Sequence, residues 1–253
     1  MSRTSMDMTR GSLKKQILFF SIPLMLSNLL QVLFNMSDIA VIGQFAGAMS
    51  LGAVGSTTTL ISMYTGFLIG LSGGINVLTA LYIGARNRKS VSETVHSAFL
   101  VSLAVGLILL ILGVSTSRGV LVLLNTKEEL IDKAALYIRI YFLGLPFMVI
   151  YNFGAAILRS YGDTRRPLYY LIISGTLNVI LNLLLVIEFH LGVAGVAIAT
   201  TISNMVSTVM VISCLHRKRD EFRFEFHKMR IEWKDLKRVL MIGIPAGIQG
   251  AIF

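Results

Sequence analysis

Apolar residues run along this chain in six long blocks, each long enough to cross a lipid bilayer as a helix. We expect membrane-spanning helices at residues 15–39, 51–83, 95–115, 131–158, 168–187 and 191–215. Asp, Glu, Lys and Arg are absent from residues 54–83, 168–187 and 191–215. About 20 such residues span the hydrocarbon core as a helix. The pattern therefore predicts an all-α, polytopic membrane protein.

Details within the blocks refine this picture. The second block, residues 51–83, is longer than one perpendicular helix requires, so we expect a tilt, a kink or an interfacial turn there. Residues 125–129 (NTKEE) are typical of a helix start with acidic residues in its first turn. Pro23 and Pro146 lie inside two blocks. Each weakens the backbone hydrogen bonding, which predicts either a static bend or a bend used in motion.

Composition and charge agree with the membrane assignment. Hydrophobic residues make up 55% of the chain and charged residues 14%, whereas soluble domains carry about 25% charged residues. The net charge of +10 would suit nucleic acid, but 19 of the 23 Lys and Arg lie before residue 17 and at residues 86–89, 159–166 and 217–238. The positive-inside rule places these segments, with the N-terminus, in the cytoplasm. We expect a multi-pass protein of the cell membrane (plasma or inner), with the lipid bilayer and not nucleic acid as partner.

Two segments near the ends of the chain resemble each other. LKKQILFFSIP ends at Pro23 and DLKRVLMIGIP ends at Pro245, 222 residues later, and Lys15 matches Lys237. Each is a basic lead-in followed by an apolar run and Ile-Pro. Internal repeats on this scale are typical of transporters built from duplicated bundles. Six crossings separate the two copies, so both enter the membrane from the same side and the repeats are parallel.

The repeat predicts three parts. Residues 1–216 would form a six-helix N-terminal lobe, and residues 217–235 a basic cytoplasmic linker with an interfacial helix. Aromatic side chains of this linker would anchor it in the inner leaflet: Phe222, Phe224, Phe226 and Trp233. Residues 236–253 would begin a second lobe. Residues 239–253 give about 22 Å of helix, short of a full crossing, so we expect helix seven and the second lobe to be incomplete.

Several motifs, in order along the chain, resemble the multidrug and toxic compound extrusion (MATE) family. They are found at residues 34–38 (FNMSD), 43–45 (GQF), 70–72 (GLS), 137–146 (YIRIYFLGLP), 158–167 (LRSYGDTRRP) and 192–200 (GVAGVAIAT). The most specific is residues 158–167, which are close to the family's Arg-x-x-Gly-Asp-Thr loop. The resemblance implies twelve helices in two six-helix lobes, with this chain covering the first lobe and the start of the second.

The resemblance also implies a function. Members of the family are antiporters that export organic, often cationic, drugs or toxic compounds in exchange for Na⁺ or H⁺, without another cofactor. No nucleotide-binding loop or nucleophile–base pair is evident in the sequence, so we do not expect an enzyme. Two alternatives stay open. A lipid-linked precursor flippase of the same superfamily would require cationic residues in its cavity. A truncated half-protein would be inactive unless a C-terminal lobe or a second copy supplied the missing wall.

Asp38 is the main candidate for ion coupling, because it is the only carboxylate attached to the first block. A charge placed toward the bilayer interior costs several kcal/mol, which makes such a residue a functional candidate. A carboxylate can carry H⁺ or help to coordinate Na⁺. Asp38 lies about 35 Å along a helix from Lys15, so it could instead cap a helix at the outer interface. The family resemblance favours ion coupling.

Three further residues complete the predicted ion-coupling set: Asn178, Asn182 and Thr200. Asn178 and Asn182 are four residues apart and share one helix face, and Thr200 reaches a comparable depth in the sixth helix. With Asp38 they would meet in an outward-facing cavity, where Asp38, Asn178 and Thr200 could hold Na⁺. Interhelical hydrogen bonding is the structural alternative for Asn178 and Thr200.

Asn182 departs from the family resemblance, since many bacterial members carry Asp there. An amide cannot bind and release a proton near neutral pH. Coupling by Asp38 alone, a Na⁺ site with fewer charges and lost coupling are all compatible with the sequence. Polar residues that could contact the substrate are Asn28, Gln31, Asn35, Tyr64 and Asn76. Met and aromatic side chains around them would give an adaptable surface for lipophilic cations.

Overall fold

The computed structural model describes residues 13–218, 222–225, 227 and 233–252. These residues form long helices joined by short turns. The helices are α1 (Leu13–Val41), α2 (Gly47–Gly84), α3 (Arg88–Leu123), α4 (Glu128–Ser160), α5 (Arg165–Leu183), α6 (Gly192–His216) and α7 (Trp233–Ile252). Two short π-helical turns, η1 (Ile42–Ala46) and η2 (Leu184–Glu188), follow α1 and α5.

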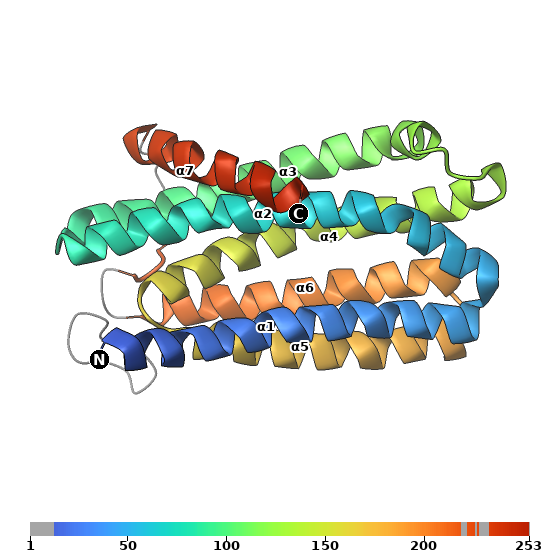
Figure 1. Cartoon of the computed structure of the whole chain (residues 1–253), viewed down its shortest axis with the longest axis horizontal. Helices are drawn as coiled ribbons and strands as arrows, with labels where there is room; N and C mark the ends of the chain where they lie inside the picture. The colour runs from blue at the N-terminus through green and yellow to red at the C-terminus, as the bar shows by residue number, and fades with distance from the viewer. Residues whose placement is uncertain (1–12, 219–221, 226, 228–232, 253) are drawn as a thin grey trace.

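The helices lie side by side with alternating directions (Figure 1). The turns at residues 85–87 and 161–164 share one end of the bundle with the start of α1 and the end of α6, and we call this the basic end. The turns at residues 42–46, 124–127 and 189–191 lie at the opposite end. The basic connections of the sequence therefore share one end, which is the arrangement that the charge pattern predicts.

Five stretches of the described residues are long and apolar enough to cross a membrane: 16–84, 88–123, 128–160, 165–188 and 192–216. The first has 69 residues and holds both α1 and α2, so it supplies two crossings. The chain reverses at η1 and at Gly47, whose φ of 81° lies in the left-handed region that glycine adopts without strain. This gives the six crossings predicted from the sequence. α2 is continuous through the second block, so no interfacial turn lies within it; the turn at η1 and Gly47 precedes it.

The core of the bundle lies along α4, which contacts α2, α3 and α6. Pro146 lies within α4 and is buried, as are most residues of its second half. α1 is more peripheral and packs mainly on α5. Many large apolar side chains of α1 are exposed, including Met25, Leu29 and Val32. Exposed apolar side chains of this kind are expected on a helix that contacts lipid or a further lobe, because neither contact favours a polar face.

α7 packs along α2 through small residues. Gly66 and Gly70 of α2 lie against the α7 backbone at Gly250 and Ala246, so closely that a methyl group on either glycine would overlap that backbone. Small residues at such crossings allow two helices to approach within van der Waals contact of their backbones. At the basic end, the buried carboxylate of Asp235 in α7 accepts a hydrogen bond of 2.6 Å from the Tyr82 hydroxyl.

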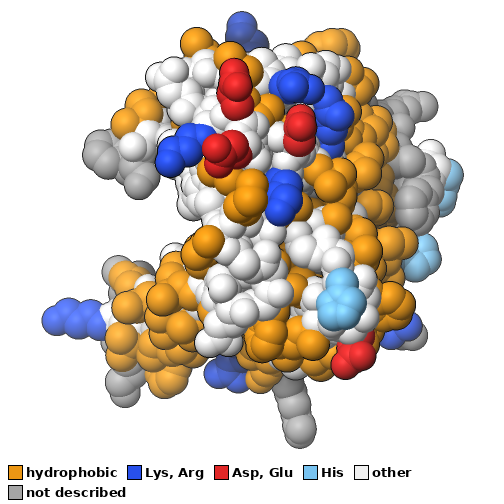
Figure 2. All heavy atoms as spheres, turned by 90° about the vertical axis from the view of Figure 1, so that its right-hand side faces the viewer, with side chains coloured by type: hydrophobic (Ala, Val, Ile, Leu, Met, Phe, Trp, Pro, Cys, Tyr) orange, Lys and Arg blue, Asp and Glu red, His pale blue; other side chains and the backbone are white. Residues whose placement is uncertain are grey.

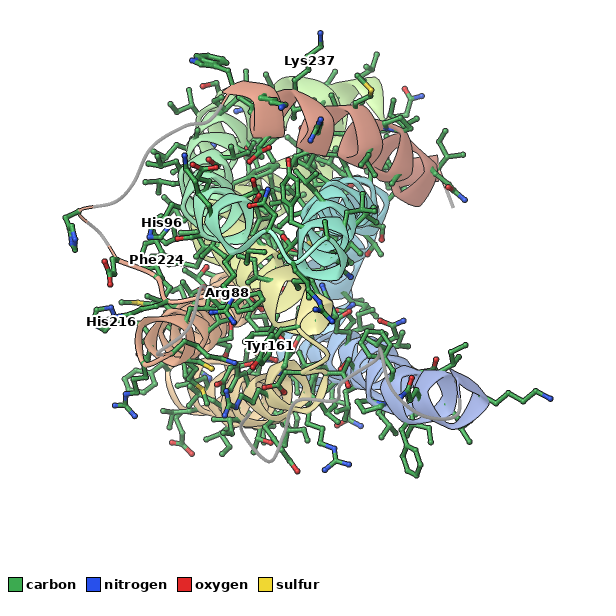
Figure 3. All side chains as sticks on the ribbon, turned by 90° about the vertical axis from the view of Figure 1, so that its left-hand side faces the viewer. Arg88, His96, Tyr161, His216, Phe224 and Lys237 are labelled. Atoms are coloured by element: carbon green, nitrogen blue, oxygen red, sulfur yellow. The ribbon has the colours of Figure 1, made fainter. Side chains whose placement is uncertain are left out.

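The interpretation of the linker aromatic residues as membrane anchors is wrong for Phe222 and Phe224. Each is only 2% exposed. The Phe222 ring lies 4.5 Å from that of Tyr161, and the Phe224 ring lies 4.5 Å from that of Phe99. Figure 3 labels Tyr161 and Phe224. The helix ends offer these rings an apolar surface, so they are buried in protein instead of lipid. Phe226 lies outside the described residues, and Trp233 is 76% exposed.

Gly70→Ala tests the packing of α7 on α2. The added methyl group would overlap the backbone at Ala246, and we expect it to lower the free energy of unfolding by about 1–3 kcal/mol, a typical cost of overpacking. Thermal unfolding in detergent and proteolysis of residues 233–252 would measure the loss. Gly73→Ala is the matched control, because its methyl group has no neighbour within 4 Å. Equal effects of the two substitutions would contradict this account of the interface.

Candidate functional site

A cavity of about 560 Å³ opens between α1, α2, α4, α5 and α6. Figure 2 shows the surface hollowed between the part of the molecule that contains α7 and the part that contains α1. Polar side chains from all five helices line the cavity: Gln31, Asn35, Asp38, Ser62, Thr65, Tyr141, Tyr151, Asn152, Ser174, Asn178, Thr200, Ser203, Asn204 and Ser207. Asp38 is the only residue with a formal charge in this lining. The cavity is therefore lined by polar and apolar side chains together and carries at most one negative charge.

The four predicted ion-coupling residues form one chain of hydrogen bonds. The Asn182 amide nitrogen donates to Asp38 Oδ1 at 2.5 Å and to Asn178 Oδ1 at 3.2 Å. The Asn178 amide nitrogen donates to Thr200 Oγ1 at 3.2 Å. The chain thus connects α1 to α5 and α5 to α6. The structure brings the four residues together, while their role in ion coupling stays a prediction.

Helix periodicity and one glycine bring these groups together. Asn178 and Asn182 lie one turn apart on the face of α5 that meets α1, and both are buried. Phe34 lies one turn before Asp38 in α1 and packs directly on Gly175 of α5. A methyl group at Gly175 would overlap the Phe34 ring, so α1 could not approach α5 as closely. The short contact between Asp38 and Asn182 depends on this approach.

Asn182 lies behind the cavity lining and is fully buried. The two acceptors, Asp38 and Asn178, determine the orientation of its amide. Its oxygen, Asn182 Oδ1, then has no hydrogen-bond partner among the described residues. A buried polar oxygen without a partner costs about 1–3 kcal/mol. This oxygen is available to a cation or to a hydrogen-bond donor next to the only carboxylate of the cavity.

The substrate-contact candidates divide into two groups. Gln31 and Asn35 line the cavity, one helical turn apart on α1. Asn28, Tyr64 and Asn76 do not line it, and their contact with substrate stays a prediction. Asn28 lies a further turn along α1, beyond the cavity, and is exposed. Tyr64 packs edge-on against Phe142, with ring centroids 5.2 Å apart, and Asn76 occupies another part of α2.

Sequence reasoning missed most of the lining from α4 and α6. Thr200, Ser203, Asn204 and Ser207 recur at intervals of three and four residues along α6. This spacing gives α6 one polar face, and the signal is visible in the sequence. Asn152 faces the cavity from α4, where its amide nitrogen also donates to the Met148 carbonyl at 2.9 Å. It lies alone among apolar residues, so its spacing gives no such signal.

Comparison with known proteins identifies the family. The family model described as MatE matches residues 23–184, which is more than half of the chain. The chain belongs to the MATE family of membrane transporters, which are not enzymes. It is 30% identical over 243 residues to the probable multidrug resistance protein YpnP of Bacillus subtilis, covering 96% of this chain and 54% of that protein. It is 26% identical to the multidrug export protein MepA of Staphylococcus saprophyticus, covering 94% of this chain and 52% of the relative.

Solved structures agree with this assignment. A MATE crystal structure in the bent conformation matches with a TM-score of 0.87 at 27% identity, over 94% of this chain and 53% of that one. An outward-facing MATE family transporter of the MOP superfamily also matches with a TM-score of 0.87 at 27% identity, over 95% and 53% of the two chains. The chain spans about half the length of the relatives it matches. Its fold is that of the N-terminal half of MATE transporters, as the sequence predicts.

Asn182→Ala tests the hydrogen-bond chain. It removes the donor from Asp38, and we expect the free energy of unfolding to fall by about 1–3 kcal/mol, because the carboxylate loses a buried partner. Thermal unfolding in detergent would measure the change. Asn204→Ala should change stability by less than about 0.5 kcal/mol, since the Asn204 side chain lines the cavity without a hydrogen bond to the described residues. In an Asp38→Asn background the cost of Asn182→Ala should shrink; an undiminished cost would contradict the pairing.

Proposed function

We propose that this chain supplies the N-terminal lobe of a secondary active antiporter that exports organic cations in exchange for Na⁺ or H⁺. The observation that carries the proposal is the single carboxylate of the cavity, Asp38, which lies beside two buried amides and a hydroxyl group. A cavity with one fixed negative charge favours cations over anions. Its aromatic and Met lining, including Tyr141, Tyr151 and Met148, suits lipophilic ligands.

The lining also separates the leading hypotheses. A flippase for lipid-linked precursors would bring phosphate groups into the cavity and would require cationic side chains there. The described lining contains neither Lys nor Arg, which supports export of cations over transfer of anionic lipids. Two relatives are named as a probable multidrug resistance protein and a multidrug export protein, and these names support the same class of substrate.

We propose that Asp38 alternates between two partners. When the cavity faces the outer side, Na⁺ or H⁺ neutralises the carboxylate. Na⁺ would be held by oxygens of Asp38, Asn178, Asn182 and Thr200, which are the hard ligands that this ion prefers. When the cavity faces the inner side, the ion leaves and the carboxylate attracts an organic cation. The Asp38 carboxylate can neutralise only one cation at a time. Entry of Na⁺ or H⁺ and exit of the organic cation therefore alternate, which makes the exchange an antiport.

The second wall of the cavity would come from a second lobe or a second copy of this chain. The hollow between α1 and α7 is where such a wall would lie (Figure 2). The basic end would face the cytoplasm, because Lys and Arg are retained on that side. Rocking of the two halves would then expose the cavity to each side in turn.

Transport by a two-lobed protein that contains these residues tests the proposal. In proteoliposomes, we expect an imposed Na⁺ or H⁺ gradient to drive export of a fluorescent cation such as ethidium. Asp38→Asn should reduce the gradient-driven rate at least about tenfold, because the amide has no charge to exchange. Asn35→Ala is the matched control on the same helix face and should keep coupling while it alters apparent affinity. Gradient-driven transport at an unchanged rate in Asp38→Asn would exclude the coupling role.

Two separate gradients identify the ion. A Na⁺ gradient at equal pH should drive transport if oxygens of the amides and of Thr200 hold the ion, and a pH gradient without Na⁺ should do so if Asp38 carries a proton.

Asn182→Asp adds a carboxylate next to Asp38, and we expect the pair to retain a proton to higher pH, since adjacent like charges resist ionisation. The pH at which proton-driven transport is half-maximal should therefore rise. An unchanged pH profile would contradict direct contact between the two groups during transport.

A further inference from the structure

Residues 222–225 of the linker dock on the basic end of α3 and α6. The backbone nitrogen of Phe224 donates to the Leu215 carbonyl at 3.1 Å, and His216 Nδ1 lies 2.9 Å from the Phe224 carbonyl oxygen. The Phe224 ring packs next to Phe99 and, with residues of α3, α4 and α6, lines a small apolar pocket. This segment lies between α6 and α7 in the chain, so its docking fixes part of the α6–α7 linker to the six-helix bundle.

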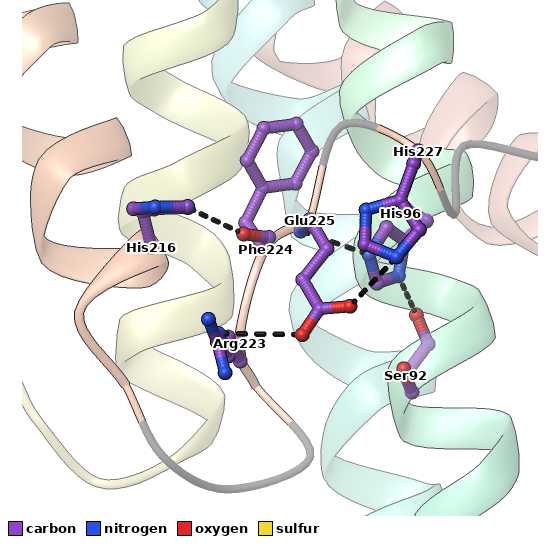
Figure 4. A network of polar contacts seen from close by, with 7 residues as sticks. All are labelled: Ser92, His96, His216, Arg223, Phe224, Glu225 and His227. Carbon is purple, nitrogen blue, oxygen red and sulfur yellow. Dashed lines mark hydrogen bonds and ion pairs between the residues drawn. The ribbon is translucent and has the colours of Figure 1, made fainter.

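His96 of α3 completes the docking site and must be neutral to do so. Its Nδ1 lies 2.7 Å from the Ser92 carbonyl oxygen, which can only accept a hydrogen bond. Nδ1 therefore carries the proton. Its Nε2 accepts a hydrogen bond of 3.1 Å from the backbone nitrogen of Glu225, so Nε2 carries none. His96 is only 3% exposed, and the geometry of the two contacts sets its tautomer (Figure 4).

A second proton on His96 would remove this contact. Protonated Nε2 becomes a donor and would face the N–H group of Glu225, which is also a donor. The hydrogen bond of His216 does not require a neutral ring, since Nδ1 can donate to the Phe224 carbonyl whether or not Nε2 is protonated. His96 is thus the histidine of this cluster whose described hydrogen bonds require the neutral ring (Figure 4).

Charged groups around His96 belong mainly to the linker. The Glu225 carboxylate pairs with Arg223 at 3.3 Å and with His227 at 3.4 Å. His216 contributes from α6, and on α3 itself Glu93 pairs with Lys89 at 3.7 Å. A protonated His96 would be attracted to the Glu225 carboxylate, so the ring could exchange its backbone partner for the side chain. Either way, the hydrogen bond that positions the Glu225 backbone is lost.

We propose that His96 is a pH-sensitive clasp that holds residues 222–225 against the bundle only while its ring is neutral, so that acidification at the basic end releases the segment. The docked state binds one proton fewer than the released state, and docking therefore weakens as pH falls. One linked proton changes the docking constant by up to about tenfold per pH unit. Release would detach residues 222–225 from the six-helix bundle, so that this attachment of the connection to α7 would be lost. The proposal concerns docking and does not depend on the transported ion.

Hydrogen exchange of the whole chain in lipid nanodiscs tests the clasp. The backbone N–H groups of Phe224 and Glu225 are both hydrogen-bonded when the segment is docked, so a peptide that covers residues 222–225 reports the state directly. We compare about pH 8 with about pH 6, a range in which imidazoles change charge, and scale exchange times for the intrinsic effect of pH. We expect about a fourfold loss of protection at the lower pH.

Matched variants assign the effect to His96. In His96→Gln the amide oxygen can accept from Glu225 without titrating, so we expect protection that is equal at both pH values. His216→Gln should keep the dependence of the native chain, because His216 is not required to be neutral. His96→Ala should lack protection at both pH values, and thermal unfolding would confirm that each variant is folded. Protection of the native chain that is unchanged between the two pH values would overturn the proposal, as would a pH dependence that survives in His96→Gln.

Discussion

A carboxylate inside an apolar helical bundle requires hydrogen-bond donors, and the arrangement of this lobe follows from how Asp38 obtains one. The donor is the buried amide of Asn182, which also donates a hydrogen bond to Asn178. The Asn178 amide in turn donates to the Thr200 hydroxyl oxygen. The short contact is possible because Gly175 lets Phe34 pack directly on α5. Loss of this approach would leave a charge in a low-dielectric surrounding without a partner, at a cost of several kcal/mol. The same constraint places the one charged group of the cavity where an ion can reach it.

Helix periodicity explains why the sequence predicts much of this site. Asn178 and Asn182 are four residues apart, so they share a face in any straight helix, and the depth of Asp38 and Thr200 follows from the rise per residue. The same reasoning predicts the crossings and the common end of the basic turns. It does not place Tyr64 and Asn76 relative to the cavity, because the direction in which a polar face of α2 points depends on how α2 packs against its neighbours.

The linker shows a different limit of sequence reasoning. Alternating basic and aromatic residues are typical of a helix on a membrane surface, and equally of a segment that packs its aromatic rings on protein. Burial of Phe222 and Phe224 decides between these interpretations, and burial depends on the pocket that α3, α4 and α6 form together. His96 was similarly unremarkable in the sequence, since the backbone nitrogen that it binds comes from residue 225, far along the chain.

Ion release upon ligand binding tests the central role of Asp38 most directly. An organic cation such as tetraphenylphosphonium would be added to the purified two-lobed protein, preloaded with Na⁺ at high pH or with protons at low pH, and the released ion would be counted. We expect about one monovalent cation released per bound ligand, and none in Asp38→Asn, because a single carboxylate serves both cations. Equal release by the native protein and by Asp38→Asn, or ligand binding without any release, would contradict it.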